Sequence, residues 1–466
     1  MMSNQAGPAD KLAPSFGPDA HSVWVAAREV HGLTPQTPVV IDPDELAYPA
    51  TFCTAPAGDY KIKAVLDVDH NFAYYDDASD GDLIGTVAEQ KFDPALGQQI
   101  SVTLTETKTD PPLQLPPHTE LFDFVSPGIS RFWGRPIHMR GAVVLPPGYH
   151  TSKAHYPTVY LTHGFGSDMK YLLQRSATNT DKLMEEKKIP EMIWVMLLQA
   201  SPTGTHEFAD SVNNGPWGKA LTAELIPYLE KKYRMDAKPS GRLLTGHSSG
   251  GWAAMWIQVS HPELFGGAWP TAPDPGDFRN FAAGADIASH PPSNFFRNAD
   301  GSTRMFIRMG GKDTQALEDL ARQERVLGEY SGQLASFEWV FSPRGKDGRP
   351  MPLFDRDTGA IDPEVAAYWE KHYDIANLLR ANWNKIGPLL SEKIHLTVGT
   401  ADTFHLDEPA RLLEQTIRDL GGKASFTYVD GRSHFDLYQG GLFERIAKEM
   451  YAVARPGTQP DTHTLP

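Results

Sequence analysis

One stretch of the chain reads Leu243-Leu244-Thr245-Gly246-His247-Ser248-Ser249-Gly250-Gly251-Trp252, and it places a serine inside the pattern Gly-x-Ser-x-Gly. The apolar residues before the pattern indicate a strand, and the segment after it, from Trp252 to Ser260, suits a helix. Glycines flank the serine because a strained strand-to-helix turn leaves no room for side chains. The pattern predicts a nucleophile at Ser248; the alternative is an ordinary glycine-rich turn.

A serine nucleophile needs a neighbouring base, which in turn is oriented by a carboxylate. In α/β-hydrolase order the acid and then the histidine follow the serine, each in the loop after a late strand. The apolar run 394–398 is followed by Gly399-Thr400-Ala401-Asp402, and the run 426–429 by Asp430-Gly431-Arg432-Ser433-His434. We therefore predict that Asp402 is the acid and that His434 is the base.

Other residues compete for these roles. Asp313 lies in a similar turn, Met309-Gly310-Gly311-Lys312-Asp313, but this turn precedes the two last strands. Asp407 is better placed as the N-cap of the helix expected from about 408 to 420. For His434 the alternative is a surface-loop histidine without a catalytic role.

The tetrahedral intermediate needs two backbone N–H groups that bind its oxyanion. We predict that one belongs to Ser249, the residue after the nucleophile, and the other to Phe165 in the sequence His163-Gly164-Phe165-Gly166. His163 is interpreted as a structural hydrogen-bonding residue rather than a second base, because one base suffices. His247 is interpreted as packed or capping.

Three residues are candidates to line the substrate pocket, namely His163, Trp217 and Trp252. For the tryptophans, and for the aromatic residues of the segment 274–390, packing in the core is the alternative interpretation.

Strands alternate with helices over the second half of the chain. The strands are expected at 137–145, 158–162, 192–198, 265–269, 393–398 and 425–429, with helical spacing at 217–233. This alternation predicts an α/β fold, specifically an α/β-hydrolase fold with a mostly parallel sheet and helices on both faces. We expect a catalytic domain at 119–273 and 391–458, interrupted by an insertion at 274–390 that protrudes beside the strand ends and forms a lid or substrate wall.

The first quarter of the chain has a different pattern. A tail or edge strand at 1–30 is followed by a β-rich, sandwich-like domain at 31–118, with short strands expected at Thr37–Ile41, Tyr60–Asp67 and Gln99–Thr105. A proline-rich linker covers 111–117, and a second tail covers 459–466. Acidic residues cluster between 67 and 82: Asp67, Asp69, Asp76, Asp77, Asp80 and Asp82. They match no EF-hand spacing, so a solvated loop is favoured over a calcium site.

Composition excludes several function classes. A net charge of −15 over 466 residues argues against binding nucleic acid or anionic membranes through bulk electrostatics. The single cysteine excludes an internal disulfide and a cysteine metal cluster. No apolar stretch has transmembrane length, and the first residues lack the features of a secretory signal, which leaves a cytoplasmic protein or one with its leader removed. No metal or other cofactor is required by the predicted chemistry, and the oligomeric state stays open.

Five segments together resemble a known family. These are Phe132-Trp133-Gly134-Arg135-Pro136, His163-Gly164-Phe165-Gly166, Gly246-His247-Ser248-Ser249-Gly250-Gly251, Gly399-Thr400-Ala401-Asp402 and Gly431-Arg432-Ser433-His434. They are similar to the α/β-hydrolase family of esterases that includes esterase D, the feruloyl esterases, the enterochelin esterases and the mycolyltransferases. The resemblance covers about 125–272 and 390–455. It implies Ser248, Asp402 and His434 as the triad, with Phe165 and Ser249 as oxyanion donors. The insertion is longer than such members carry.

The predicted function is therefore a serine carboxylic-ester hydrolase that works through an acyl-enzyme on acyl or aryl, feruloyl-like, esters. Its substrate partner would be a small-molecule or carbohydrate-linked ester. An acyltransferase, a siderophore-ester hydrolase, a serine peptidase and a non-catalytic carbohydrate- or polymer-binding module are the alternatives.

Overall fold

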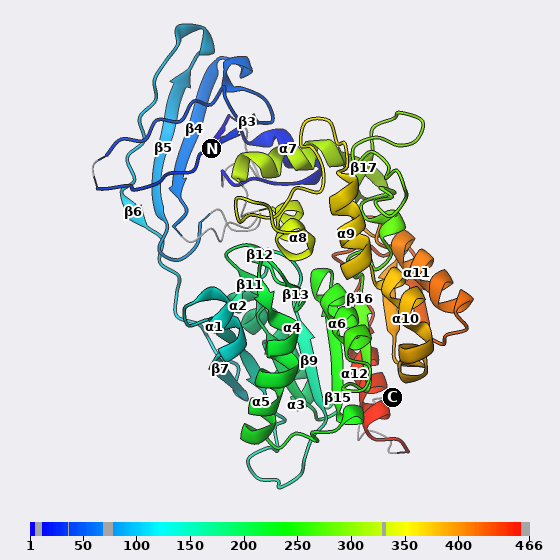
Figure 1. The fold of residues 1–466 in the computed structure, drawn as a ribbon. Helices are drawn as coiled ribbons and strands as arrows, with labels where there is room; N and C mark the ends of the chain where they lie inside the picture. Colours follow the sequence, from blue (N-terminus) through cyan, green and yellow to red (C-terminus); the bar gives the residue numbers. More distant parts are fainter. Residues whose placement is uncertain (5–11, 36, 69–77, 329–331, 458–466) are drawn as a thin grey trace.

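The computed structural model describes residues 1–4, 12–35, 37–68, 78–328 and 332–457. A mixed eight-stranded sheet forms the lower half of the molecule, with helices on both of its faces (Figure 1). Its strands, in chain order, are β7 (Thr119–Val125), β8 (His138–Val144), β9 (Thr158–Thr162), β10 (Ile193–Leu197), β15 (Arg242–His247), β16 (Gly267–Thr271), β19 (His395–Gly399) and β20 (Ser425–Val429).

The spatial order of this sheet is β7-β8-β10-β9-β15-β16-β19-β20, so the third and fourth strands exchange places. Strand β8 is antiparallel to both neighbours, whereas all pairs from β10 to β20 are parallel. This is the α/β-hydrolase arrangement, and the predicted fold class is confirmed. Parallel neighbours bring the carboxyl ends of β9, β15, β16, β19 and β20 to one edge of the sheet, where the loops after them meet.

Two hydrophobic cores lie on the two faces of the sheet, because side chains alternate along a strand. In β10, Trp194 and Met196 belong to one core, and Ile193, Val195 and Leu197 belong to the other. Burial on both faces explains why this strand reads as an unbroken apolar run. The flanking helices are α1 (Pro127–Trp133), α2 (Met169–Tyr171), α3 (Thr178–Glu185), α4 (Trp217–Ala220), α5 (Ile226–Lys232), α6 (Ser249–Ser260), α11 (Asp407–Asp419) and α12 (Leu442–Ala454).

The N-terminal part is β-rich, but it is built on one four-stranded antiparallel sheet rather than two stacked sheets. Its strands are β1 (Met2–Ser3), β4 (Gly58–Leu66), β5 (Leu83–Phe92) and β6 (Glu106–Thr107), beside the pair β2 (Val25–Ala26) and β3 (Ala47–Tyr48). The prediction of a strand at Thr37–Ile41 is wrong, because Val39, Val40 and Ile41 are exposed and pair with no strand among the described residues. The strand expected at Gln99–Thr105 is also displaced. The chain joins β5 only where the Thr105 N–H donates to Ile84 O, and the ladder lies at β6.

Only part of the acidic loop can be described. Asp69, Asp76 and Asp77 lie outside the described residues. Asp82 is buried and accepts hydrogen bonds from the N–H groups of Val68 and Ser79, so it organises its own turn.

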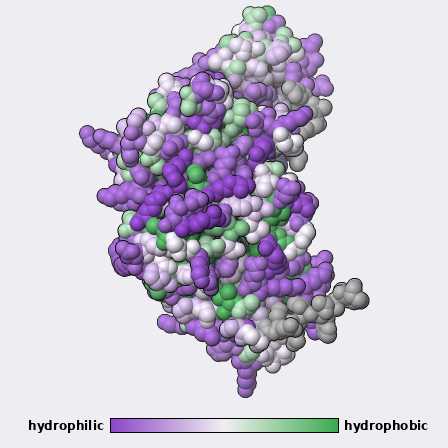
Figure 2. All heavy atoms as spheres, turned by 90° about the vertical axis from the view of Figure 1, so that its right-hand side faces the viewer, coloured by the Kyte–Doolittle hydropathy of each residue, from purple (hydrophilic) through white to green (hydrophobic). Residues whose placement is uncertain are grey.

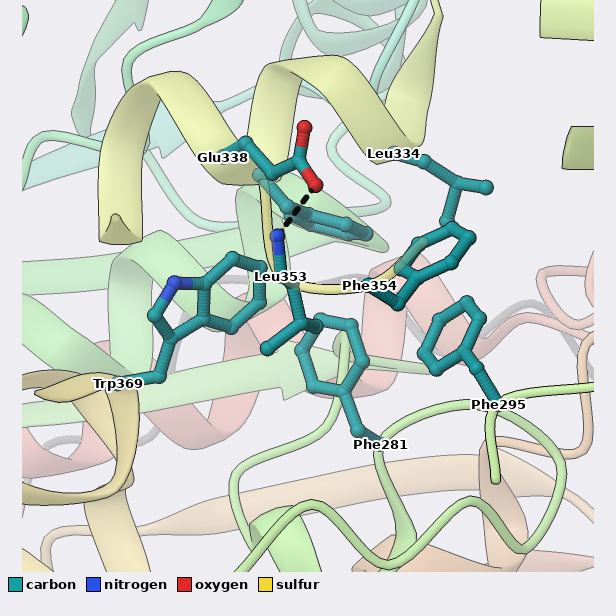
Figure 3. A pocket seen from close by; sticks show the side chains of 8 residues that line it. Phe281, Phe295, Leu334, Glu338, Leu353, Phe354 and Trp369 are labelled. Atoms are coloured by element: carbon teal, nitrogen blue, oxygen red, sulfur yellow. Dashed lines mark hydrogen bonds between the residues drawn. The ribbon is translucent and has the colours of Figure 1, made fainter. Parts of the chain in front are cut away.

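The segment between β16 and β19 folds against the catalytic domain. It contains β17 (Met305–Met309), β18 (Lys312–Ala316), α7 (Leu317–Leu327), α8 (Gln333–Phe341), α9 (Pro363–Tyr373) and α10 (Ile375–Leu390). Its aromatic side chains converge on one another: Figure 3 shows Phe281, Phe295, Phe354 and Trp369 packed with Leu334 and Leu353 beneath Glu338. They leave no space for a water molecule, so these aromatic residues form a core and not a substrate pocket.

The outer surface on this side of the molecule agrees with an insertion whose aromatic side chains are packed in its interior. Figure 2 shows that the face formed by the right-hand side of Figure 1 is mostly hydrophilic, with small separate apolar spots. Among the described residues, no helix combines the length and the apolar character needed to cross a membrane.

Candidate active site

Ser248 lies in the turn between β15 and α6, at the carboxyl end of the central strand. Its backbone has φ +58° and ψ −127°, a strained conformation for a residue with a side chain. A Cβ at position 246 would lie 2.2 Å from Gly250 O, and one at position 250 would lie 2.5 Å from Thr162 O. Both glycines are therefore required, and the turn holds the serine at the sheet edge.

His434 and Asp402 meet at the same edge of the sheet. Asp402 follows β19 and His434 follows β20, and the Nδ1 atom of His434 lies 2.9 Å from Oδ2 of Asp402. The other oxygen of Asp402 accepts hydrogen bonds from the N–H groups of Phe404 at 2.9 Å and Leu406 at 3.3 Å. Burial alone raises the pKa of Asp402, but the charge and hydrogen bond of His434 and the two backbone donors outweigh it, so this pKa lies below its ordinary value. Asp402 is thus an ionised partner for His434.

Ser248 and His434 line one cleft. The ring of His247, the residue before Ser248, lies 4.4 Å from the ring of His434. Burial first, and then the proximity of His434, lower the pKa of His247 to about 3, so His247 is neutral at neutral pH. Its Nδ1 lies 3.1 Å from Thr271 Oγ1, in agreement with a packing role.

The loop after β9 passes directly over the nucleophile. A Cβ at Gly164 would lie 3.2 Å from the Cβ of Ser248, and the next residue, Phe165, lines the same cleft as Ser248. The N–H of Ser249 is the first of helix α6, one of the donors that a helix leaves without an intrahelical partner. These are the two donors predicted for the oxyanion.

His163 holds this loop in place. Its Nδ1 donates to Gly164 O at 2.7 Å, while its Nε2 accepts from the Gln199 N–H at 2.8 Å. Burial lowers its pKa to about 4, so both hydrogen bonds use the neutral ring. His163 lies at the cleft, but its nitrogens are engaged in positioning the loop.

The competing aspartates lie elsewhere. Asp313 is in β18, its side chain is 48% exposed, and its Oδ1 lies 3.7 Å from Nε2 of His405. Asp407 is in the first turn of α11 rather than at its N-cap, which is Leu406, and its carboxylate lies 3.4 Å from Arg308. His434 pairs with Asp402 and with neither of these. Among the described residues, no group of histidine, cysteine and acidic side chains is arranged to hold a metal ion.

Comparison with known proteins gives the family. A family model described as "Putative esterase" matches residues 135–441, about two thirds of the chain. The chain belongs to this esterase family. It is a carboxylic-ester hydrolase.

Individual relatives of the esterase match over shorter stretches. The uncharacterized protein YbbA of Bacillus subtilis is 22% identical over 39% of this chain and 72% of its own. Esterase Rv1288 of Mycobacterium tuberculosis is 30% identical over 24% of each chain. An endo-1,4-beta-xylanase/feruloyl esterase of Xylanibacter ruminicola is 29% identical over 27% of this chain and 18% of its own. A solved ferulic acid esterase is 16% identical, with a TM-score of 0.43 over 72% of this chain and 98% of its own.

The cleft of the esterase has a volume of about 1230 Å³, and segments from distant parts of the chain form its walls. They include the N-terminal part, the loop and helices after β9, the hairpin after β10, the turn that holds Ser248, the segment from β17 to α8, and the loops around Phe404 and His434. The two tryptophans predicted to line it do not. Trp217 is buried, stacks on His206 and donates to Asn214 O, and Trp252 is buried on α6 against Trp256. Their size and apolar character fill the core, as the alternative interpretation had it.

An aromatic wall, which the sequence did not indicate, flanks His434 of the esterase. Phe404 lies edge-on to His434 at 4.8 Å, and Phe435 lies 5.3 Å from it. Phe16, from the N-terminal part, stacks on Phe435 at 6.1 Å. Its segment is tied down where the Gly17 N–H donates to Gln315 at 2.8 Å. We call Phe16, Phe404 and Phe435 the aromatic wall.

Arg308 of β17 also supports the site. Its guanidinium donates to the carbonyl oxygen of Asp402 at 2.9 Å and 3.2 Å, and its N–H donates to Thr403 O at 2.8 Å. The insertion therefore braces the loop that carries the triad acid. No sequence motif marked Arg308, because the contact spans 94 residues.

Proposed function

We propose that this esterase hydrolyses its substrate through an acyl-enzyme formed on Ser248, with His434 as the base and Asp402 as its orienting acid. The pairing of His434 Nδ1 with the buried Asp402 carboxylate, beside a serine on a strained turn, is the observation that carries the proposal. Asp402 accepts a hydrogen bond from the Nδ1–H group of His434, so the neutral ring presents its Nε2 lone pair to the hydroxyl of Ser248.

The reaction then follows the usual order of acyl transfer. Ser248 Oγ attacks the ester carbonyl while its proton passes to His434, and the N–H groups of Phe165 and Ser249 bind the oxyanion. The imidazolium protonates the leaving alcohol, which leaves the acyl group on Ser248. Water, activated by the neutral His434, releases the acid and restores the serine.

The substrate class follows from the cleft. The aromatic wall offers ring faces beside His434, and more than half of the Phe435 side chain is exposed. Aromatic rings prefer stacked or edge-to-face neighbours. We propose that the substrate is an ester that carries an aromatic ring, a class that the name of the xylanase/feruloyl esterase relative also contains.

The mechanistic part is tested by Ser248→Ala. We expect it to lose labelling by a fluorophosphonate probe and to lower kcat on p-nitrophenyl butyrate by about a thousandfold or more. Ser260→Ala, at the other end of α6, is the matched control and keeps both. A Ser248→Ala protein that folds as judged by circular dichroism and still turns over at the wild-type rate refutes the assignment.

The substrate class is tested with matched pairs of esters. Methyl 3-phenylpropionate is compared with methyl 3-cyclohexylpropionate, and benzyl acetate with cyclohexylmethyl acetate. A ring contact of about 0.5–1.5 kcal/mol corresponds to a preference of about two- to twelvefold for the aromatic member. Equal kcat/KM values within both pairs would exclude an aromatic substrate.

A further inference from the structure

Two carboxyl groups that the mechanism does not use are buried next to the nucleophile. Glu207 precedes β13 (Asp210–Ser211) and is fully buried, and Asp274 follows β16 and is 5% exposed. Among the described residues neither forms an ion pair with a lysine or arginine. Buried carboxylates without a cation are costly, so this pair requires a physical explanation.

Ser249 connects the two carboxyls. Its hydroxyl donates to Oδ2 of Asp274 at 2.6 Å, and it also lies beside the carboxyl of Glu207, where it lowers the pKa of that group. One oxygen of Glu207 accepts from the hydroxyl of Thr205 at 2.9 Å, whereas its Oε2 is buried without a hydrogen-bond partner. The single proton of Ser249 is engaged on Asp274, so it cannot serve both acids.

The protonation states follow from these surroundings. Burial, and then the charge of Asp274, raise the pKa of Glu207 well above its ordinary value. Burial raises the pKa of Asp274 to about 6. The hydrogen bond from Ser249 and the nearby His434 lower this pKa, whereas the charge of Asp402 raises it. Burial and the charge of Asp274 thus act against a second negative charge, which favours a proton on Glu207 and the negative charge on Asp274, where the Ser249 hydroxyl donates.

The two histidines on the Glu207 side are uncharged. His206 is adjacent to Glu207 in the chain, and burial together with the proximity of His163 lowers its pKa well below the ordinary value. His163 is neutral as described above. On the Asp274 side, His434 and Asp402 act on the pKa of Asp274 in opposite directions.

We propose that Glu207 in its protonated form, Ser249 and ionised Asp274 form a hydrogen-bonded relay that fixes the Ser249 peptide as an oxyanion donor. In this relay Glu207 donates to the Ser249 oxygen, and Ser249 donates to Asp274. The N–H of Asp274 also lies 3.3 Å from Ser248 O, so the same loop holds the nucleophile turn through its backbone. Glu207 and Asp274 are positioning residues, and the inference rests on the proposed role of Ser249.

The relay has a pH consequence. When Glu207 loses its proton, two negative charges flank the oxyanion site and Ser249 loses one donor, so the oxyanion is destabilised. We expect kcat to fall at alkaline pH with the ionisation of Glu207, while KM changes little because neither acid touches the substrate.

The test compares Glu207→Gln with Glu207→Leu. Glutamine keeps a neutral donor of the same shape, whereas leucine removes it. At pH 7 we expect kcat to fall less than about fivefold in Glu207→Gln and about twentyfold or more in Glu207→Leu, as for loss of support to an oxyanion donor. The alkaline decline of kcat should be absent from Glu207→Gln. Asp277→Asn alters another buried acid in the same loop, one paired with Arg279 outside the cleft, and should keep the decline.

A spectroscopic measurement keeps the inference testable if Glu207→Leu does not fold. The infrared difference between the wild type and Glu207→Gln should show the loss of one buried protonated carboxyl, and the difference between Asp274→Asn and the double variant with Glu207→Gln should show the same loss. The band of Asp374, whose pKa burial raises to about 7, cancels in each difference. Two results would overturn the relay: an unchanged alkaline decline in Glu207→Gln, or equal kcat values in the glutamine and leucine variants. Ser248→Ala separates the two levels, since full activity there refutes the proposed function itself, whereas an inactive Ser248→Ala together with an unchanged alkaline decline in Glu207→Gln refutes the relay alone.

Discussion

Replacing Asp402 by asparagine tests the proposed triad, because the surroundings of the side chain dictate how the new amide sits. Two backbone N–H groups, of Phe404 and Leu406, point at one oxygen of Asp402. Only the amide oxygen of an asparagine can accept from both. The NH₂ group must then take the place of Oδ2, 2.9 Å from His434 Nδ1.

An NH₂ group at that place reverses the hydrogen bond to His434. Nδ1 must then carry the lone pair, so the proton of the neutral ring moves to Nε2, the nitrogen that should accept the proton of Ser248. The imidazolium also loses its carboxylate partner. Loss of a triad carboxylate lowers kcat by about 10⁴, or about 5.5 kcal/mol of transition-state free energy. We expect Asp402→Asn to lower kcat/KM by about 10³–10⁴, mostly through kcat.

The assay is hydrolysis of p-nitrophenyl butyrate, with thermal unfolding to check that each variant is folded. Asp313→Asn is the matched control, because Asp313 competes for the acid role in sequence but lies half-exposed on β18. We expect it to keep kcat/KM within about threefold, as is usual for surface substitutions. A folded Asp402→Asn protein within tenfold of the wild type, or a larger loss in Asp313→Asn, would refute the reasoning.

Three further outcomes are expected. Gly250→Ala places a Cβ 2.5 Å from Thr162 O, so it should lower the free energy of unfolding by about 1–3 kcal/mol and reduce kcat, measured by urea denaturation and ester turnover; unchanged values would contradict the tight turn. In the ester pair for which the wild type prefers the aromatic member, Phe16→Leu should at least halve the ratio of kcat/KM values and should change kcat/KM for the cyclohexyl member little. An equal loss on both members would show that Phe16 does not contact the aromatic ring of the substrate. The pKa of Asp274 is raised to about 6, from an ordinary value of 3.8. The protonated carboxyl therefore stabilises the folded protein below pH 3.8, and this stabilisation is lost as pH rises to about 6, a change of about 3 kcal/mol at most in the free energy of unfolding. The unfolding free energy of Asp274→Asn relative to wild type should therefore increase from pH 4 to pH 7, and a difference that stays constant over this range would contradict the raised pKa.

The sequence predicted the parts of the site that depend on where strands end. Ser248, Asp402 and His434 each follow an apolar run directly, and a parallel sheet brings such positions to one edge without any knowledge of the intervening chain. Apart from the edge strand β7, which was not predicted, strand positions in the sheet were predicted to within about two residues, because strands buried on both faces have a strong apolar pattern. In the N-terminal part the pattern was weaker, and Thr37–Ile41 is apolar without a partner strand to bury it.

What the sequence did not reveal depends on contacts between distant segments. Phe16 reaches Phe435 across 419 residues of chain, and the sequence around it carries no motif. Glu207 and Asp274 are ordinary acidic residues until burial removes their solvent, and only the fold shows that one hydroxyl lies between them. Trp217 and Trp252 show the converse, since size and aromaticity alone do not distinguish a core residue from a pocket residue.

These contacts indicate that the parts of the molecule contribute to the site in different ways. The sheet edge provides Ser248, His434 and Asp402, the proposed nucleophile, base and acid, and these residues lie close to strand ends. Most aromatic residues of the insertion pack with one another without space for a water molecule, but Phe306 lines the cleft and lies 5.6 Å from Phe404, and Arg308 holds the Asp402 loop from outside the sheet. The N-terminal part adds Phe16 to a wall whose other members neighbour the triad in sequence. It follows that the reaction type belongs to the family fold, whereas the choice of ester depends on segments that lie outside the central sheet, so relatives that share only the sheet give little information about the substrate.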